Sequence, residues 1–291
     1  MGHHRMITAA DVALRTEVRC ESPVVRLEAR AEGLVAFTAS GDAFRARRVV
    51  LAASPIETAR ILEFSLPEKQ RRPRVDLFDH LIAGAIAVAH RERHSKHPRA
   101  AAEPSAVIHP PRNARVRFTT EIRGPTPLES LDAEDLASLG FTGEQAVRHS
   151  FYVVFAMGET DPAKPRKVEF DARALDGLGR PSPRFIARAH TNTEVSLGKQ
   201  MNRQVIGLAR ELASSRDRAF LIYDALDFSS GGHEVGTCLD RIDAQGQVKA
   251  LPGVFIADGA GVPAATDRHP SLTLAANALR VAAALSRSLE E

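Results

Sequence analysis

The stretch Arg48–Leu62, RVVLAASPIETARIL, decides the fold. Its first part, Arg48–Ala53, is a short apolar run that ends in a Ser-Pro turn, which is typical of a buried strand. Its second part, Ile56–Phe64, predicts a helix, and Pro55 suits the first helical position. Because strand, tight turn and helix make up the unit of doubly wound sheets, the stretch predicts an α/β layer.

Segments with strand or helix character surround this unit. Before it, Gly41-Asp42 is a hairpin signal between two strand-like runs. After it come further strand-like runs, a helix with apolar residues at helical spacing, and a last helix that is apolar almost all round and is therefore expected to be buried. The predicted strands are Pro23–Ala29, Leu34–Ala39, Leu81–Ala89, Val116–Ile122, Phe151–Met157, Lys167–Phe170 and Gly253–Ala257, and the predicted helices are Glu194–Ser214 and Pro270–Leu285.

The composition is that of an ordinary globular protein. Of 291 residues, 44% are hydrophobic and 26% charged, which allows one large domain or two interleaved ones. The net charge of 39 − 36 = +3 is too small to indicate a nucleic-acid-binding protein. The best basic cluster, Arg71-Arg72-Pro73-Arg74, is short and is interpreted as a solvated loop rather than a phosphate site.

Cysteine usage and hydropathy favour a cytoplasmic protein. Cys20 and Cys238 are far apart and form no CxxC pair or disulfide framework. The N-terminal residues have no apolar core of the signal-peptide type. The longest apolar run, Leu81–Ala89, is far too short to span a bilayer, so no membrane span is predicted.

Several common motifs fail. The sequence holds no G-x-G-x-x-G after a strand, no P-loop and no G-x-S-x-G. His90, His94 and His97 are candidate metal ligands, because two histidines four residues apart share a helical face. The segment follows a strand-like run and ends in Pro98, so a solvated loop is the favoured interpretation and no metal is predicted.

Four segments, in order, resemble the glucose–methanol–choline (GMC) family of FAD oxidoreductases. In the first, Arg48–Leu62, Ser54 stands where the family has glycine and Ala59 where it has proline. Asp79-His80 is similar to the D-H at the start of the family's substrate domain. The other three segments are Lys167–Pro183, Gly232–Cys238 (GHEVGTC) and Val254–Arg280.

The resemblance implies a fold and an activity. The expected fold is α/β (α+β overall), with a partial FAD-binding Rossmann-like unit made of residues 1–65 and 231–291. An antiparallel-sheet substrate domain, residues 66–230, is inserted into it. The implied activity is oxidation of the CH–OH group of a small-molecule alcohol by hydride transfer to the flavin. Neither the alcohol nor the electron acceptor is indicated.

The resemblance also assigns site residues. His233 matches the base that takes the hydroxyl proton, a task that suits histidine because its ordinary pKa is close to neutral. His269 matches the residue that hydrogen-bonds the substrate oxygen beside the flavin. Asp258 and Gly259 match the FAD-contacting D-G, and Pro270 opens a helix whose positive end would face the flavin ring. Val24 resembles a valine whose backbone touches the adenine.

The dinucleotide-binding part of the family is not matched in this sequence. The sequence begins just before the strand Val24–Leu27, and the loop after Cys238 is shortened. We therefore expect FAD binding by the isolated chain to be weak or absent, with the missing part supplied by another chain or segment. The alternative is a truncated, flavin-free remnant or an interaction module with no activity alone.

Overall fold

The strand–turn–helix unit forms where the sequence predicts it. β4 (Val49–Leu51) leads through Ser54 into α2 (Pro55–Ser65), with Pro55 in the first turn. β4 pairs in parallel with β13 (Val254–Ile256), which brings two distant parts of the chain together. The computed structural model describes residues 15–90, 104–111, 117–126, 133–227 and 232–290.

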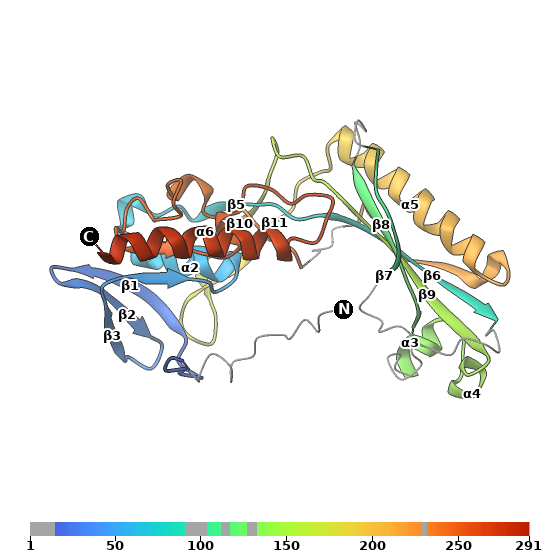
Figure 1. The fold of residues 1–291 in the computed structure, drawn as a ribbon, viewed down its shortest axis with the longest axis horizontal. Helices are drawn as coiled ribbons and strands as arrows, with labels where there is room; N and C mark the ends of the chain where they lie inside the picture. Colours follow the sequence, from blue (N-terminus) through green and yellow to red (C-terminus); the bar gives the residue numbers. More distant parts are fainter. Residues whose placement is uncertain (1–14, 91–103, 112–116, 127–132, 228–231, 291) are drawn as a thin grey trace.

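The described part of the chain is mixed α+β, with three antiparallel sheets besides the β4–β13 pair (Figure 1). The first sheet has the order β1 (Val24–Arg30), β2 (Gly33–Thr38), β3 (Ala43–Ala46). The second has the order β11 (Pro181–Ile186), β10 (Arg166–Leu175), β5 (Arg74–Leu77). The third has the order β12 (Ala219–Tyr223), β6 (Leu81–His90), β9 (His149–Gly158), β8 (Phe118–Thr126), β7 (Pro104–Ile108).

The five-stranded sheet packs on the long helix α5 (Asn192–Leu212), which lies along its outer face in Figure 1. The sequence of β6 explains the close fit, because its alternating alanines present a flat surface to α5. Met201 and Val205 of α5 fill this surface and are fully buried. The opposite face of β6 carries Val88, which packs with α3 (Ala133–Ser138) and α4 (Gly143–Ala146).

The core around β4 takes side chains from both predicted domains. Leu62 of α2 and Val254 of β13 lie in it, as the prediction of a shared unit requires. Val75 of β5 and Phe170 of β10 belong to the same cluster, although they fall within the predicted substrate domain. The division at residue 65 stays a prediction.

The last helix differs from expectation. α6 (Ser271–Glu290) forms as predicted, but only Val281 and Ala284 are buried, so the prediction of an all-round buried helix is wrong. Leu272 is 83% exposed and Leu279 73% exposed, because one side of the helix alone rests on the described part of the chain. None of the helices in this part is long and apolar enough to cross a bilayer.

The sequence prediction missed the short strands β5, β7, β11 and β12. β5 and β7 come from the Pro-, Arg- and His-rich region between residues 67 and 115, where composition favours loops. Each missed strand has only four to six residues and lies at the edge of its sheet, so its sequence signal is short. His94 and His97 lie outside the described residues, and His90 stacks on His149 with 5.7 Å between ring centroids.

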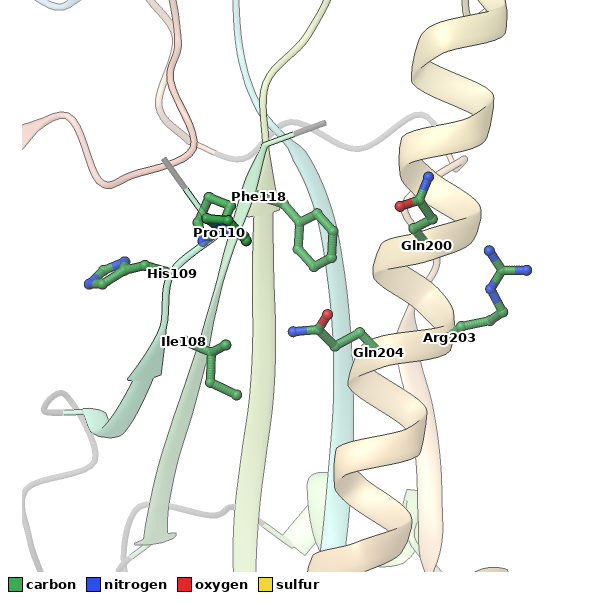
Figure 2. Close-up of a pocket in the computed structure, with 8 residues that line it drawn as sticks. Ile108, His109, Pro110, Phe118, Gln200, Arg203 and Gln204 are labelled. Atoms are coloured by element: carbon green, nitrogen blue, oxygen red, sulfur yellow. The ribbon is translucent and has the colours of Figure 1, made fainter. Parts of the chain in front are cut away.

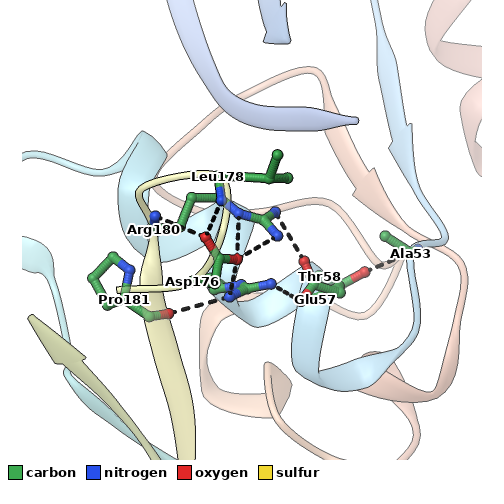
Figure 3. Close-up of polar contacts among 8 residues, drawn as sticks. Ala53, Glu57, Thr58, Asp176, Leu178, Arg180 and Pro181 are labelled. Atoms are coloured by element: carbon green, nitrogen blue, oxygen red, sulfur yellow. Dashed lines mark hydrogen bonds and ion pairs between the residues drawn. The ribbon is translucent and has the colours of Figure 1, made fainter. Parts of the chain in front are cut away.

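An ion-pair network ties the β10–β11 turn to α2 (Figure 3). Arg60 of α2 is 5% exposed and donates to Asp176 Oδ2 at 3.0 Å and to the Pro181 carbonyl at 3.2 Å. Arg180 donates to Asp176 Oδ2 at 2.8 Å and to Glu57 Oε2 at 3.1 Å. Hydrogen bonds from Arg180, its backbone N–H first, hold the pKa of Asp176 well below its ordinary value. The turn therefore packs on the first turns of α2 with its charges paired.

Ser54 adopts a backbone conformation that favours glycine. Its φ is 77° and its ψ is 150°, a region that side-chain-bearing residues rarely occupy. This is the position at which the resembled family has glycine, so the departure in sequence falls on a strained residue. The Ser54 side chain makes no capping hydrogen bond that would offset the strain.

We expect Ser54→Gly to raise the free energy of unfolding by about 1 kcal/mol, because glycine removes the strain at little steric cost. Urea unfolding followed by circular dichroism measures the change. Ser54→Ala is the matched control, since alanine keeps the unfavourable φ and should bring no gain. Equal stability of the glycine and serine proteins would show that the strain is absent in solution.

Candidate active site

A backbone bridge positions the loop that carries His233, the predicted base. Phe78, just after β5, and Val235 exchange two backbone hydrogen bonds of 3.0 and 2.9 Å. Gly236 has a φ of 87°, and a Cβ built on it would lie 2.4 Å from the Phe78 ring, so only glycine fits. The next residue, Thr237, donates its hydroxyl to the Pro55 carbonyl at 2.7 Å. The loop that carries His233 is thereby fixed to both β5 and α2.

The structure brings His233 and His269 together. Nδ1 of His269 lies 3.4 Å from Nε2 of His233, and the ring centroids are 5.1 Å apart. His233 is half-buried, while the His269 side chain is 38% exposed at the start of α6. The Pro270 carbonyl accepts the first α6 hydrogen bond, from Leu274 at 2.8 Å. One small polar atom could therefore reach both ring nitrogens.

His80 is a third histidine in the group. It lies between β5 and β6, is 1% exposed, and meets the His233 ring edge to face with 5.1 Å between centroids. Asp79 Oδ1 accepts the backbone N–H of His80 at 2.7 Å, which fixes the backbone here. Among the described residues, no atom makes a hydrogen bond of normal geometry with either ring nitrogen of His80 or with Nδ1 of His233.

Strand β8 supplies charged partners that the sequence analysis missed. Glu121 Oε1 lies 3.2 Å from His269 Nε2, and Arg123 Nη2 lies 3.1 Å from the same nitrogen. Arg123 also pairs with Glu121 at 2.6 Å, and Thr119 donates to the buried Asp267 at 3.1 Å. Residues two apart on a strand share a face. The polar residues at alternate positions, Thr119, Glu121 and Arg123, were therefore the sequence signal that could have placed these side chains together on one face of β8.

Burial and mutual repulsion keep the inner histidines neutral. Burial, and then the neighbouring His233, lower the pKa of His80 from its ordinary 6.5 to about 4. The Thr266 backbone opposes this shift only in part. Burial, and then His269, also lower the pKa of His233, against the weaker opposite effects of Asp79 and Glu234. A neutral His233 is the form that can accept a proton near neutral pH.

The predicted cofactor residues Asp258 and Gly259 have roles within the chain. Asp258 accepts hydrogen bonds from the Thr58 hydroxyl at 2.5 Å and the Ala260 N–H at 2.9 Å, which ties β13 to α2. Burial raises the pKa of the Asp258 carboxyl. A Cβ on Gly259 would lie 2.9 Å from the Glu234 carbonyl and from Pro55, so internal packing alone requires glycine. Val24 opens β1 and packs against the core around β4. Their contacts with a cofactor stay predictions.

A hollow of about 600 Å³ lies on the other face of the five-stranded sheet (Figure 2). Gln200 and Gln204 extend from α5 toward Phe118 of β8, and Gln204 donates to Thr120 at 3.0 Å. Phe118 and Thr120 alternate along β8 with the residues that approach His269, so the sheet separates this hollow from the histidines. The described residues include no cluster of three or more side chains suited to hold a metal.

No protein-family model and no curated protein matches the sequence. The structure is similar to the crystal structure of pyridoxine 4-oxidase from Mesorbium loti, with a TM-score of 0.54 and 16% sequence identity. The match covers 97% of this chain and 62% of that one, so the chain spans less than two thirds of the length of the protein it resembles. At this identity the likeness shows the fold alone, which resembles part of that oxidase.

We expect the free energy of unfolding to fall as the pH drops from 6.5 toward 4. In this window an unfolded chain protonates His80, whereas the folded protein, with its lowered pKa, does not. The groups facing His80 are His233, His269, Asp79 and Asp267.

The loss attributable to His80 between pH 7 and pH 5 should be about 2 kcal/mol. Urea unfolding at each pH measures it, and His80→Gln should remove that part of the slope. His109→Gln, at an exposed position outside the histidine group, is the control and should leave the slope unchanged. A slope that His80→Gln leaves intact would contradict the lowered pKa.

Proposed function

We propose that this chain carries the substrate-binding side of a flavin-dependent alcohol oxidoreductase that oxidises a CH–OH group. The observation that carries the proposal is the pair His233 and His269, with facing nitrogens 3.4 Å apart. Such a pair suits a hydroxyl that must lose its proton while its oxygen stays bound. The similar fold of pyridoxine 4-oxidase, whose name describes an oxidase, supports the same reaction class.

The residues at the start of α6 fit the ring end of a flavin. Ser271, Leu272 and Thr273 are exposed, and the first N–H groups of a helix have no partner within it. They follow directly on His269, so the positive end of α6 lies beside the histidine pair. A bound flavin would supply the hydride acceptor. The sequence holds no glycine-rich turn of the G-x-G-x-x-G type for its pyrophosphate.

His233 and His269 would have complementary tasks. His233 accepts the hydroxyl proton on Nε2, since its lowered pKa leaves this nitrogen unprotonated near neutral pH. His269 holds the same oxygen through Nδ1. Arg123 and Glu121 hold His269 Nε2 from the other side, at 3.1 and 3.2 Å, and so fix the ring orientation.

Part of the surface suits a partner that would complete the site. Leu272 and Leu279 expose an apolar stripe of α6, and Val50 of the two-stranded β4–β13 pair is 43% exposed. An exposed apolar face beside an open strand edge is the kind of surface that a further α/β layer covers. We propose that a segment or chain with the dinucleotide-binding motif packs here. The same surface is the observation that favours the second candidate function, a flavin-free interaction module.

We expect His233→Ala to lower turnover roughly 100-fold, the usual scale for loss of a general base. The assay uses the chain combined with a segment that carries the dinucleotide-binding motif, with pyridoxine and simple primary alcohols as substrates and a redox dye as acceptor. His109→Ala is the control and should retain turnover. Full activity of the His233 variant would exclude it as the base.

We also expect the isolated 291-residue protein to bind FAD weakly, because the pyrophosphate supplies most of the affinity at a glycine-rich turn. Titration of the purified protein with FAD, followed by flavin fluorescence, tests this. Stoichiometric binding by the monomer at micromolar concentration would contradict the expectation. A colourless protein that still binds a folded partner would favour the interaction module.

A further inference from the structure

The fold adds cations to the basic cluster Arg71–Arg74, which taken alone is too short to predict a phosphate site. A hollow of about 390 Å³ lies where the segment after α2 meets the loop that leads to β13. Side chains from both segments line it, although the two segments are far apart in the sequence. The cationic ones are Lys69, Arg71, Arg72, Arg241 and Lys249. The structure thus gathers in one place a charge that the sequence distributes over two segments.

Two ion pairs neutralise part of this charge. Arg72 pairs with Asp240, which also lines the hollow. Arg241 pairs with the buried Glu63. Three cations form no ion pair with a residue that the structure describes: Lys69, Arg71 and Lys249. The local charge is therefore 5 − 2 = +3, as large as the net charge of the whole chain.

The three cations without ion pairs have hydrogen-bond donors to spare. Arg71 donates from Nε to the Leu66 carbonyl at 3.0 Å, and its terminal nitrogens make no hydrogen bond with a described residue. Lys249 uses one of its N–H groups, which it donates to the Asp240 carbonyl at 3.2 Å. The Lys69 ammonium group has no hydrogen-bond partner within the described ranges. Free N–H groups on several cations around one hollow are the donor set that an oxyanion with more than one charge accepts.

A buried arginine forms part of the wall. Arg241 is 8% exposed, and its Nη2 makes no hydrogen bond of normal geometry with the described residues. Burial lowers the pKa of Arg241, and the attraction of Glu63 opposes this shift only in part. A buried cation that its partner does not fully compensate is stabilised by a second anion nearby.

The end of α2 accounts for only one of these cations. A helix end favours cations near its last carbonyls, and the contact of Arg71 with the Leu66 carbonyl is of this kind. Lys249 comes from the other segment, where its backbone N–H bonds the Arg241 carbonyl at 2.9 Å. This bond fixes the backbone of Lys249 beside the buried arginine, so the convergence of the two segments is built into the fold.

We propose that this hollow binds a phosphate group, free or carried by a small molecule, through Lys69, Arg71 and Lys249. Three cations suit the charge of about −1.5 to −2 on a phosphate monoester near neutral pH better than the single charge of a carboxylate. The site is separate from the predicted cofactor contacts, because Leu66 in its wall lies about 12 Å along α2 from Thr58, which holds Asp258. It therefore goes beyond the proposed alcohol oxidation and does not depend on it.

The test is calorimetric titration of the full chain, in a phosphate-free buffer of constant ionic strength, with inorganic phosphate and with methyl phosphate. We expect saturable binding of one equivalent at millimolar concentration or below. Binding of both probes would assign the site to a phosphate group carried by a small molecule, and binding of inorganic phosphate alone would assign it to the free ion. The absence of saturable binding would overturn the proposal. Much tighter binding of a short single-stranded oligonucleotide would overturn the assignment to a small ligand.

Variants locate the binding. The double variant Lys69→Gln/Lys249→Gln should bind phosphate roughly tenfold more weakly, because it removes two of the three free cations. The matched control is Lys164→Gln/Lys199→Gln, which removes the same charge at exposed positions outside the hollow and should leave the affinity unchanged. Equal losses in the two double variants would show a non-specific charge effect and overturn the site.

A third variant predicts a change of opposite sign. Asp240→Asn removes the one anionic side chain among the residues that line the hollow and releases Arg72, so phosphate should bind roughly threefold more tightly. The backbone carbonyl that Lys249 contacts is retained. Weaker binding by a folded Asp240→Asn protein, with folding checked by circular dichroism, would contradict the proposed charge balance.

Discussion

The candidate site depends on two backbone hydrogen bonds between Phe78 and Val235. The three histidines come from segments that are far apart in the sequence, and this bridge joins the first two of them. It forms only because Gly236 has no Cβ, which lets the Phe78 ring lie against the backbone. His269 joins the group from the start of α6, and Val262 and Ala265 pack with Phe78 and Val235 beneath it. A small apolar cluster thus supports a polar surface.

Much of the fold could be predicted because apolar periodicity is a local signal. β6 and α5 are long and strongly patterned, and both predictions are confirmed. The short edge strands gave runs too short to stand out, although β12, AFLIY, is apolar throughout. α6 was predicted as buried because it is rich in alanine and leucine, but composition cannot tell which protein surface, if any, covers a helix. The charged residues of β8 were missed because their partner, His269, lies 146 residues away from Arg123.

The motifs that carried the family resemblance divide into two kinds. Gly236 and Gly259 are required by contacts inside the chain, since a Cβ on either would collide with its own neighbours. Asp258 likewise joins β13 to α2 through Thr58. These residues indicate the fold, and a protein with this fold would need them even if it bound no cofactor. His233 and His80 are different, because each carries a buried ring nitrogen that makes no hydrogen bond with the described residues, so internal hydrogen bonding does not account for a histidine there. The chemical hypothesis rests on the histidines and not on the glycines.

Strand β8 is shared between two environments. One face carries Glu121 and Arg123 to His269, and the other carries Phe118 and Thr120 to α5. Mechanical coupling follows from this arrangement, because a shift of α5 against the sheet displaces the same backbone that holds the His269 ring. Substitutions between α5 and the sheet would then alter the distance and orientation of His233 and His269 without contacting either residue. The packing of α5 on the sheet thus helps to hold the strand that positions the His269 ring.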